Sequence, residues 1–187
     1  MATRIRPALT VADLALMPED GNRYEVIEGE LFVTRASGLH HQRLSGRLFL
    51  ALSAYLEHHP VGEVFQAPGV LFDDFSGVVP DLVFISHGRL GEVAAGDRIE
   101  GAPELLIEIL SPGAENIRRD RVVKRQAYGK HGVLEYWIVD PNAQTVEVYG
   151  LERGVLELQG RFGVEDKVTS SVLKGLELIV GDLFARS

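Results

Sequence analysis

The chain has 187 residues, of which 45% are hydrophobic and 25% are charged, and its formal net charge is −8. This size and composition are ordinary for a globular protein, so we expect a single domain over residues 1–187. The absence of cysteine excludes disulfides and thiolate metal sites, and the negative charge argues against a protein that coats nucleic acid through bulk electrostatics.

Neither a membrane segment nor an export signal is predicted. The chain contains no run of about 18 apolar residues. Near the N-terminus, charged residues and Pro18 come before a signal-like apolar core could form. We therefore expect a cytoplasmic protein with no membrane partner. Any bound metal must use carboxylate, imidazole, carbonyl or water ligands, which favours hard ions such as magnesium or manganese.

The first thirty-odd residues predict a short helix followed by a hairpin. Thr10 is a candidate N-cap for a helix that runs to about Leu16 and ends before Pro18. The run YEVIEGELFV then predicts two short strands that turn at Glu28 and Gly29.

A long helix is predicted from His40 to about His58. Leu44, Leu48 and Leu52 recur at helical spacing within it. His41 lies three residues before Leu44, so it stands at the head of the buried stripe. The helix is therefore expected to direct an imidazole inward at its N-terminus.

Strands and a second helix make up the rest of the chain. The three strands expected next are Glu63–Phe72, Val78–Ile85 and Glu104–Leu110. Residues 87–103, rich in glycine and charge, are expected to form an exposed loop. The second helix is expected from about Asn116 to Lys130, and Gly132 ends it.

After this helix, LEYWIVD and TVEVYG predict two strands, and the remainder predicts a further hairpin and an apolar tail, LKGLELIVGDLF. The order is one helix, three strands, a second helix and further strands, with flanking hairpins. It favours an α/β fold of the α+β kind, in which helices flank a mixed sheet.

Two acidic residues lie in or beside apolar strands, where a buried carboxylate needs a compensating partner. Glu108 lies inside the apolar run LLIEIL, and Asp81 follows Pro80 at the start of DLVFI. A carboxylate in an apolar strand is costly to bury unless it is paired, protonated or bound to a cation. Magnesium, which takes one or two carboxylates and fills its remaining positions with water and phosphate oxygens, suits such a pair. The alternative is that both acids are structural and Asp81 faces water.

The order of several motifs resembles a known family. The strings YEVIEGEL, HHQRLSGRLFLAL, VVPDLVFIS, GAPELLIEILSP and RRDRVVKRQAYGKHGVLEYWIVDP are similar, in this order, to a large bacterial and cyanobacterial family of restriction-endonuclease-like proteins. That family was long described as a domain of unknown function and is assigned to the PD-(D/E)XK nuclease superfamily. The resemblance runs from about Tyr24 to the C-terminus. It implies a restriction-endonuclease-like core in which Asp81 and Glu108 hold the metal.

The chain departs from the superfamily pattern at one position. Two residues after the acid the superfamily normally places a lysine, and here Leu110 stands there. In divergent members a lysine from the second helix takes over, and Lys124 is the candidate. Asp120, Lys124 and Tyr128 share one helical face at four-residue spacing, so the alternative is a surface pair of Asp120 with Lys124. The catalytic interpretation requires the Lys124 ammonium within about 4 Å of the Glu108 or Asp81 carboxylate.

Other candidates have weaker support. His41 could be a ligand, a phosphate contact or a proton carrier, or a hydrogen-bonded core residue. Glu25 and Glu28 could supply a further acid or face water, and Ser111 could reach a phosphate or cap a turn. The arginines of the second helix could contact DNA or form a solvated face; they are Arg118, Arg119, Arg121 and Arg125.

The leading hypothesis is a metal-dependent DNA endonuclease that hydrolyses phosphodiester bonds with Mg²⁺ or Mn²⁺ at Asp81 and Glu108. Lys124 and His41 complete the predicted catalytic set. The alternative is a catalytically inactive dimeric DNA-binding or scaffold module of the same fold, and a third hypothesis is hydrolysis of a small phosphorylated molecule. We also expect a homodimer, because the apolar tail offers surface to bury.

Overall fold

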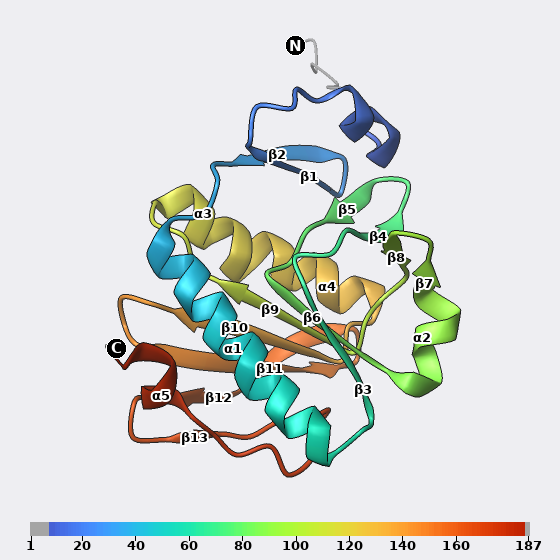
Figure 1. Cartoon of the computed structure of the whole chain (residues 1–187). Coiled ribbons are helices and arrows are strands. Elements are labelled where there is room, and N and C mark those ends of the chain that lie inside the picture. The colour runs from blue at the N-terminus through green and yellow to red at the C-terminus, as the bar shows by residue number, and fades with distance from the viewer. Residues whose placement is uncertain (1–7, 186–187) are drawn as a thin grey trace.

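The computed structural model describes residues 8–185, and a mixed sheet forms its centre (Figure 1). In spatial order, its strands within the described chain are β12 (Val155–Phe162), β11 (Thr145–Glu152), β10 (Glu135–Asp140), β9 (Leu105–Ile109), β6 (Leu82–Ser86) and β3 (Gly62–Gln66). β3, β6 and β9 are antiparallel neighbours, whereas β9 and β10 are parallel. The expected mixed sheet with three antiparallel strands is therefore present.

A long helical segment connects β9 to β10, because two parallel neighbours need a crossover. It consists of α3 (Ala114–Arg118), the π-helical η2 (Arg119–Lys124) and α4 (Arg125–His131). Gly132 ends it in the left-handed conformation, with φ of 89°. The second predicted helix and its stop are thus confirmed. The π-helical turn within it was not predicted.

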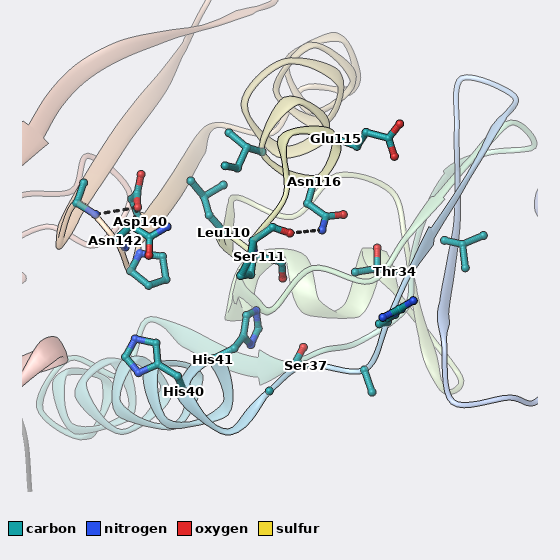
Figure 2. A pocket seen from close by; sticks show the side chains of 18 residues that line it. Thr34, Ser37, His40, His41, Leu110, Ser111, Glu115, Asn116, Asp140 and Asn142 are labelled. Atoms are coloured by element: carbon teal, nitrogen blue, oxygen red, sulfur yellow. Dashed lines mark hydrogen bonds between the residues drawn. The ribbon is translucent and has the colours of Figure 1, made fainter.

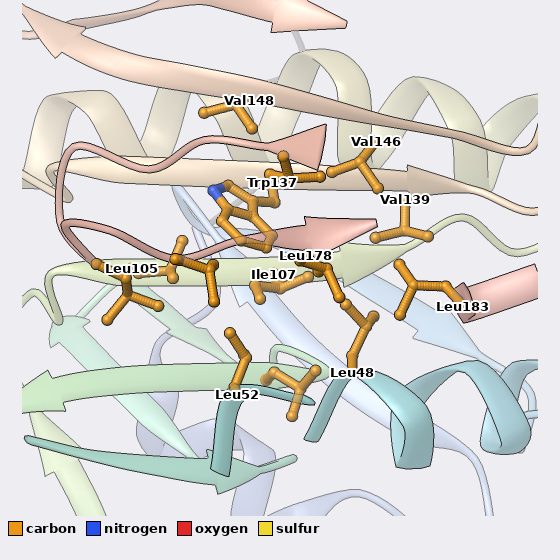
Figure 3. Packing of buried hydrophobic residues seen from close by; sticks show 14 of the residues in the cluster. Leu48, Leu52, Leu105, Ile107, Trp137, Val139, Val146, Val148, Leu178 and Leu183 are labelled. Carbon is orange, nitrogen blue, oxygen red and sulfur yellow. The ribbon is translucent and has the colours of Figure 1, made fainter. Parts of the chain in front are cut away.

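Helix α1 (Leu39–His58) covers one face of the central sheet. Side chains alternate along a strand, and Leu105 and Ile107 of β9 point to this face. They pack with Leu48 of α1 and with Trp137, which is fully buried (Figure 3). Trp137 is therefore a core residue of this domain.

The opposite face of β9 meets the second helix. Leu106 and Leu110 pack in a second cluster with Tyr128 of α4. Glu108 lies two residues after Leu106 in β9 and two before Leu110, which directly follows the strand, so its side chain is directed toward α4 as well. Strand periodicity thus points the carboxylate at the helix that carries Lys124.

A second sheet, which was not predicted, packs on this same side. In spatial order, its strands within the described residues are β2 (Glu30–Thr34), β1 (Arg23–Ile27), β5 (Ser76–Val78), β4 (Val70–Asp73), β8 (Arg98–Glu100) and β7 (Ala94–Ala95). Ile27, Val70 and Ile99 join the cluster that contains Tyr128. The predicted hairpin at Glu28 and Gly29 is confirmed as β1 and β2, and it forms one end of this sheet.

Three boundaries differ from expectation. The run Glu63–Phe72 breaks at Ala67, whose φ is +47°, so that β3 and β4 belong to different sheets. The run Val78–Ile85 breaks at Pro80, which cannot donate a ladder hydrogen bond. The predicted exposed loop over residues 87–103 is wrong. It holds α2 (His87–Val93), β7 and β8, because the buried side chains of Val93 and Ile99 anchor it.

Both ends of the described chain are folded onto the domain. Thr10 and Asp13 form a capping box at the start of η1 (Val11–Leu16), as expected of an N-cap. The C-terminal part contains β13 (Lys167–Val168), β14 (Leu178–Ile179) and α5 (Val180–Phe184), and it contacts α1. Within residues 8–185, no helix combines the length and the apolar character needed to cross a membrane.

The sheet face that packs on α4 can be tested with two leucines of β12. Leu156 is 1% exposed and belongs to the cluster of Tyr128, whereas Leu158 is 50% exposed on the same strand. Leu156→Ala is expected to lower the free energy of unfolding by about 2–5 kcal/mol, and Leu158→Ala by less than about 1 kcal/mol. Urea denaturation measures both, and equal losses would contradict this packing.

Candidate active site

Asp81 and Glu108 are brought to neighbouring strands of the central sheet and are both buried. Asp81 directly precedes β6, and Glu108 lies within β9, the antiparallel neighbour of β6. Asp81 Oδ2 accepts a hydrogen bond of 2.8 Å from the backbone N–H of Ile109, the residue after Glu108. The interpretation of Asp81 as a solvent-exposed acid is therefore wrong.

Lys124 lies against Glu108. Its Nζ donates hydrogen bonds of 2.8 Å to Oε1 of Glu108 and to Oε1 of Glu25, and its side chain is 0% exposed. The predicted approach to within about 4 Å of the Glu108 carboxylate is confirmed. Lys124 also forms the expected pair with Asp120, at 4.0 Å from its Oδ1, but both side chains are buried, so the interpretation of this pair as a surface pair is wrong.

The π-helical turn places this lysine. η2 contains Lys124 at its last position, and such turns occur mostly as single insertions that are frequent at functional sites. One helical turn later, the Tyr128 hydroxyl donates to the same Glu108 oxygen at 2.9 Å. The buried Tyr136 hydroxyl donates to the backbone carbonyl of Asp120 at 3.1 Å. The helix is thus fixed to the sheet at both sides of Lys124.

Asp81 is held by two basic side chains from other elements, His41 and Arg23. His41, at the N-terminus of α1, places Nε2 at 3.0 Å from Asp81 Oδ2. Arg23 of β1 donates to Asp81 Oδ1 at 3.3 Å and to the carbonyl of Val79 at 2.9 Å. The inward direction predicted for His41 is therefore confirmed, whereas the contribution of Arg23 was not predicted.

The two carboxyl groups differ in pKa. Burial raises the pKa of Glu108 to about 8, and the negative charges of Asp81, Asp120 and Glu25 act in the same direction against Lys124. Burial also opposes ionisation of Asp81. The hydrogen bond and charge of His41 and the charge of Arg23 outweigh burial there, so the pKa of Asp81 lies below its usual value. At neutral pH Asp81 is the ionised member of the pair, and Glu108 carries a proton in most molecules.

Glu25 is the third acid of the cluster. Burial disfavours its charge, but the charge and hydrogen bond of Lys124 and the N–H of Val79 hold its pKa below the ordinary value. Its second oxygen, Oε2, is buried with no hydrogen-bond partner among the described residues. An unpaired buried oxygen is costly, and it marks a place where a further ligand could bind.

The donor set fits a hard divalent cation. Within residues 8–185, no group of three or more His, Asp and Glu side chains could hold a metal by itself. Magnesium, however, needs only one or two carboxylates and keeps several waters. Both hydrogen bonds to Glu108 found in the described chain end on Oε1, so Oε2 could bind a metal ion. Among the residues that the structure describes, Asp81 Oδ1 accepts one hydrogen bond, the long one of 3.3 Å from Arg23.

A pocket of about 700 Å³ opens beside this cluster (Figure 2). It lies between the N-terminus of α1, the segment after β9 and the turn after β10. His41 lines it, whereas Asp81, Glu108 and Lys124 do not. His41 therefore stands between the pocket and the buried carboxylates, because it also contacts Asp81.

Residues 11–181 match the Uma2 family, which is described as "Putative restriction endonuclease". The chain belongs to this family. No curated protein matches the chain. A solved structure from Anabaena variabilis ATCC 29413, described as a putative nuclease belonging to DUF820, is 23% identical over 94% of this chain and 97% of that one, with a TM-score of 0.75. The type IIG restriction endonuclease BpuSI has a TM-score of 0.45 and 12% identity, over 78% of this chain and 15% of that one.

The Anabaena likeness confirms the expected restriction-endonuclease-like α/β fold for this Uma2-family chain. Sequence reasoning ranked Glu25 low, because alternating charges in a hairpin usually face water. That expectation is wrong, because the last three residues of β1, Glu25 to Ile27, are all buried. Arg23 carried no signal of its own, since a lone arginine before a strand is ordinary.

Among the remaining candidates, Arg119 lies beside the cluster and the others lie outside it. Arg119 is buried and forms hydrogen bonds with Asp120 and Thr34. Glu28 pairs with Lys130 at the surface, which agrees with the water-facing alternative. Ser111 lines the pocket. Arg121 pairs with Asp140 and Glu147, so it forms part of an ion-pair network on its own domain.

Proposed function

We propose that this protein hydrolyses phosphodiester bonds in DNA with Mg²⁺ or Mn²⁺ held by Asp81 and Glu108. The observation that carries the proposal is the Lys124 ammonium at 2.8 Å from Glu108. Leu110 cannot supply the cation that the superfamily pattern places beside this acid, and Lys124 can. Membership of the Uma2 family supports the same class of reaction.

In this proposal the acidic residues hold the metal ion, and the basic residues position the acids. Bound at the two carboxylates, a divalent cation would polarise the scissile phosphate and lower the pKa of an attacking water. Lys124 favours the ionised form of Glu108 and fixes its Oε1, so that Oε2 remains available. His41 and Arg23 keep Asp81 ionised and oriented. His41 also faces the pocket, where its ring could contact a phosphate.

Cleavage assays with isosteric variants test the proposal. Asp81→Asn and Glu108→Gln are expected to reduce Mg²⁺-dependent DNA cleavage below detection, because each removes a charged metal ligand and keeps the side-chain shape. Glu28→Gln, an acid at the surface of the hairpin, should cut like the wild type. Circular dichroism checks that each variant is folded. Undiminished cleavage by either isosteric variant would contradict the assignment.

One observation favours the second candidate, a catalytically inactive DNA-binding or scaffold module. The cluster is already paired internally, since Asp81 accepts from His41, Arg23 and the N–H of Ile109. Such an arrangement can persist after activity is lost, as a structural ion-pair network. Absence of cleavage of any nucleic acid with either metal would favour this function.

We also propose that the protein forms a homodimer. Most apolar residues of the C-terminal tail, including Leu178 and Leu183, are buried in its own core, so the tail offers less surface than the sequence suggests. Leu50 of α1 and Ile179 are exposed and line one groove. Sedimentation equilibrium at micromolar concentration is expected to give a dimer, and Leu50→Glu a monomer, because a charge would enter the contact. A monomeric wild type would contradict the proposal.

A further inference from the structure

The pocket beside the cluster has no assigned ligand, and we propose that it binds an unpaired nucleotide of a single-stranded DNA segment. This inference rests on the proposed nuclease function and names its substrate class. Three properties of the pocket carry it: its position, the chemistry of its walls and its charge.

The pocket lies where open α/β sheets usually bind ligands, outside the carboxyl ends of parallel strands. Ser111 follows β9 and Asn142 follows β10, and both line the pocket. His41 lines it from α1 and places Nε2 at 3.0 Å from Asp81 Oδ2 (Figure 2). A nucleotide in the pocket would therefore lie one side chain away from the proposed metal ligand.

The walls combine apolar surface with unused polar groups. A volume of about 700 Å³ is in the range of small-molecule sites, which are largely apolar with a few polar groups. Leu110, Ile117 and Pro141 supply apolar surface. The His40 ring and the side-chain amide of Asn142 form no hydrogen bond with any described residue. Unpaired bases are recognised by such means, through stacking on rings and hydrogen bonds to their edges.

The charge around the pocket suits one phosphodiester better than a duplex. Duplex DNA carries one negative charge per about 1.7 Å and needs an extended basic surface. The lining contains one arginine, Arg35, and two acids, Glu115 and Asp140. Asp140 is paired with Arg121 at 3.1 Å, so its charge is largely neutralised. Arg35, His40 and His41 can contact a single phosphate, but they do not form the extended basic surface that a duplex needs.

Binding in EDTA tests this inference separately from cleavage. A labelled single-stranded oligonucleotide and a blunt duplex of equal length are titrated by fluorescence anisotropy, with a mononucleotide as competitor. The single strand is expected to bind about tenfold more tightly than the duplex. His40→Ala should weaken it about fivefold, as the loss of one stacked base does. His58→Ala, at the other end of the same helix, is the matched control and should bind normally.

Ala36→Trp provides a second variant, because it adds bulk to the pocket without touching the buried cluster. It should abolish the preference for the single strand. Equal or tighter duplex binding overturns the inference, as does normal binding by both His40→Ala and Ala36→Trp, or no binding at all. Competition by the mononucleotide alone, with no oligonucleotide binding, would assign the pocket to a small phosphorylated molecule and also overturn it. Strong single-strand binding without cleavage in Mg²⁺ or Mn²⁺ would support the pocket and contradict the nuclease function.

Discussion

Lys124→Ala is expected to abolish cleavage and to lower the free energy of unfolding by about 3–5 kcal/mol at neutral pH. Lys124 is the buried counter-ion of Glu25 and also donates a hydrogen bond to Glu108, at 2.8 Å from each. Removing it leaves the ionised Glu25 buried without this cation and Glu108 without a hydrogen-bond donor, and an uncompensated buried charge is far more costly than a lost surface pair. The loss of the charge beside Glu108 would remove the catalytic cation at the same time.

The loss of unfolding free energy in Lys124→Ala should depend on pH. In the wild type the pKa of Glu25 lies below its ordinary value, so its ion pair contributes stability above the unfolded-state pKa and loses it as the pH falls through the folded-state pKa. The difference between Lys124→Ala and the wild type should therefore be largest near neutral pH and shrink on acidification. Urea denaturation over a series of pH values measures it.

Lys130→Ala is the matched control for this variant. Lys130 also pairs with a glutamate, Glu28, but its side chain is 61% exposed, so the variant should lose less than about 1 kcal/mol and cut normally. Lys124→Arg should not restore activity, because a planar, bulkier guanidinium has to occupy a fully buried site. A Lys124→Ala protein with wild-type stability and cleavage would contradict both roles of the lysine.

The parts of the fold that sequence could predict are those with a long, regular pattern. α1 follows from leucines at helical spacing, and the strand containing Glu108 follows from a short apolar run with one charge. Asp81 could be placed because Pro80 favours an extended entry to a strand. Lys124 could be singled out only through the family resemblance, since a long basic side chain on a helix is usually solvated.

The second sheet could not be predicted for a physical reason. Its strands β5, β4, β8 and β7 have two to four residues each, too few to show a period of two. β5 pairs with β1 and β8 pairs with β4 across distant parts of the chain, and long-range pairing leaves no local signal. This sheet carries Glu25, 99 residues away from Lys124. Glu25 could be named as a candidate acid, but its burial beside Lys124 was beyond the reach of local patterns.

Metal binding is expected to release close to one proton per ion at pH 7. The pKa of Glu108 is raised to about 8 in the metal-free protein, so at pH 7 most of its carboxyl groups are protonated. A divalent cation binds the ionised form and must displace that proton. Asp81 contributes little, because its pKa is lowered and it is already ionised. Proton release should therefore fall toward zero above about pH 9, where Glu108 is ionised without metal.

The raised pKa of Glu108 also determines how the free energy of unfolding changes with pH. Between the unfolded-state pKa of Glu108, about 4.5, and its folded-state pKa of about 8, the folded protein binds more protons than the unfolded chain. This group therefore makes the metal-free protein less stable as the pH rises through that window. Glu108→Gln removes the dependence, and saturating Mn²⁺ should suppress it because the ion stabilises the carboxylate.

Isothermal titration calorimetry with Mn²⁺, in two buffers of different ionisation enthalpy, measures the released protons directly. The wild type should release nearly one proton at pH 7, and Glu108→Gln should bind more weakly and release almost none. His41 offers the competing source, since its pKa is raised: burial alone would lower it, but the hydrogen bond and charge of Asp81 outweigh burial. Glu108→Gln keeps His41, so full proton release by this variant would assign the proton to the imidazole and contradict the role proposed for Glu108.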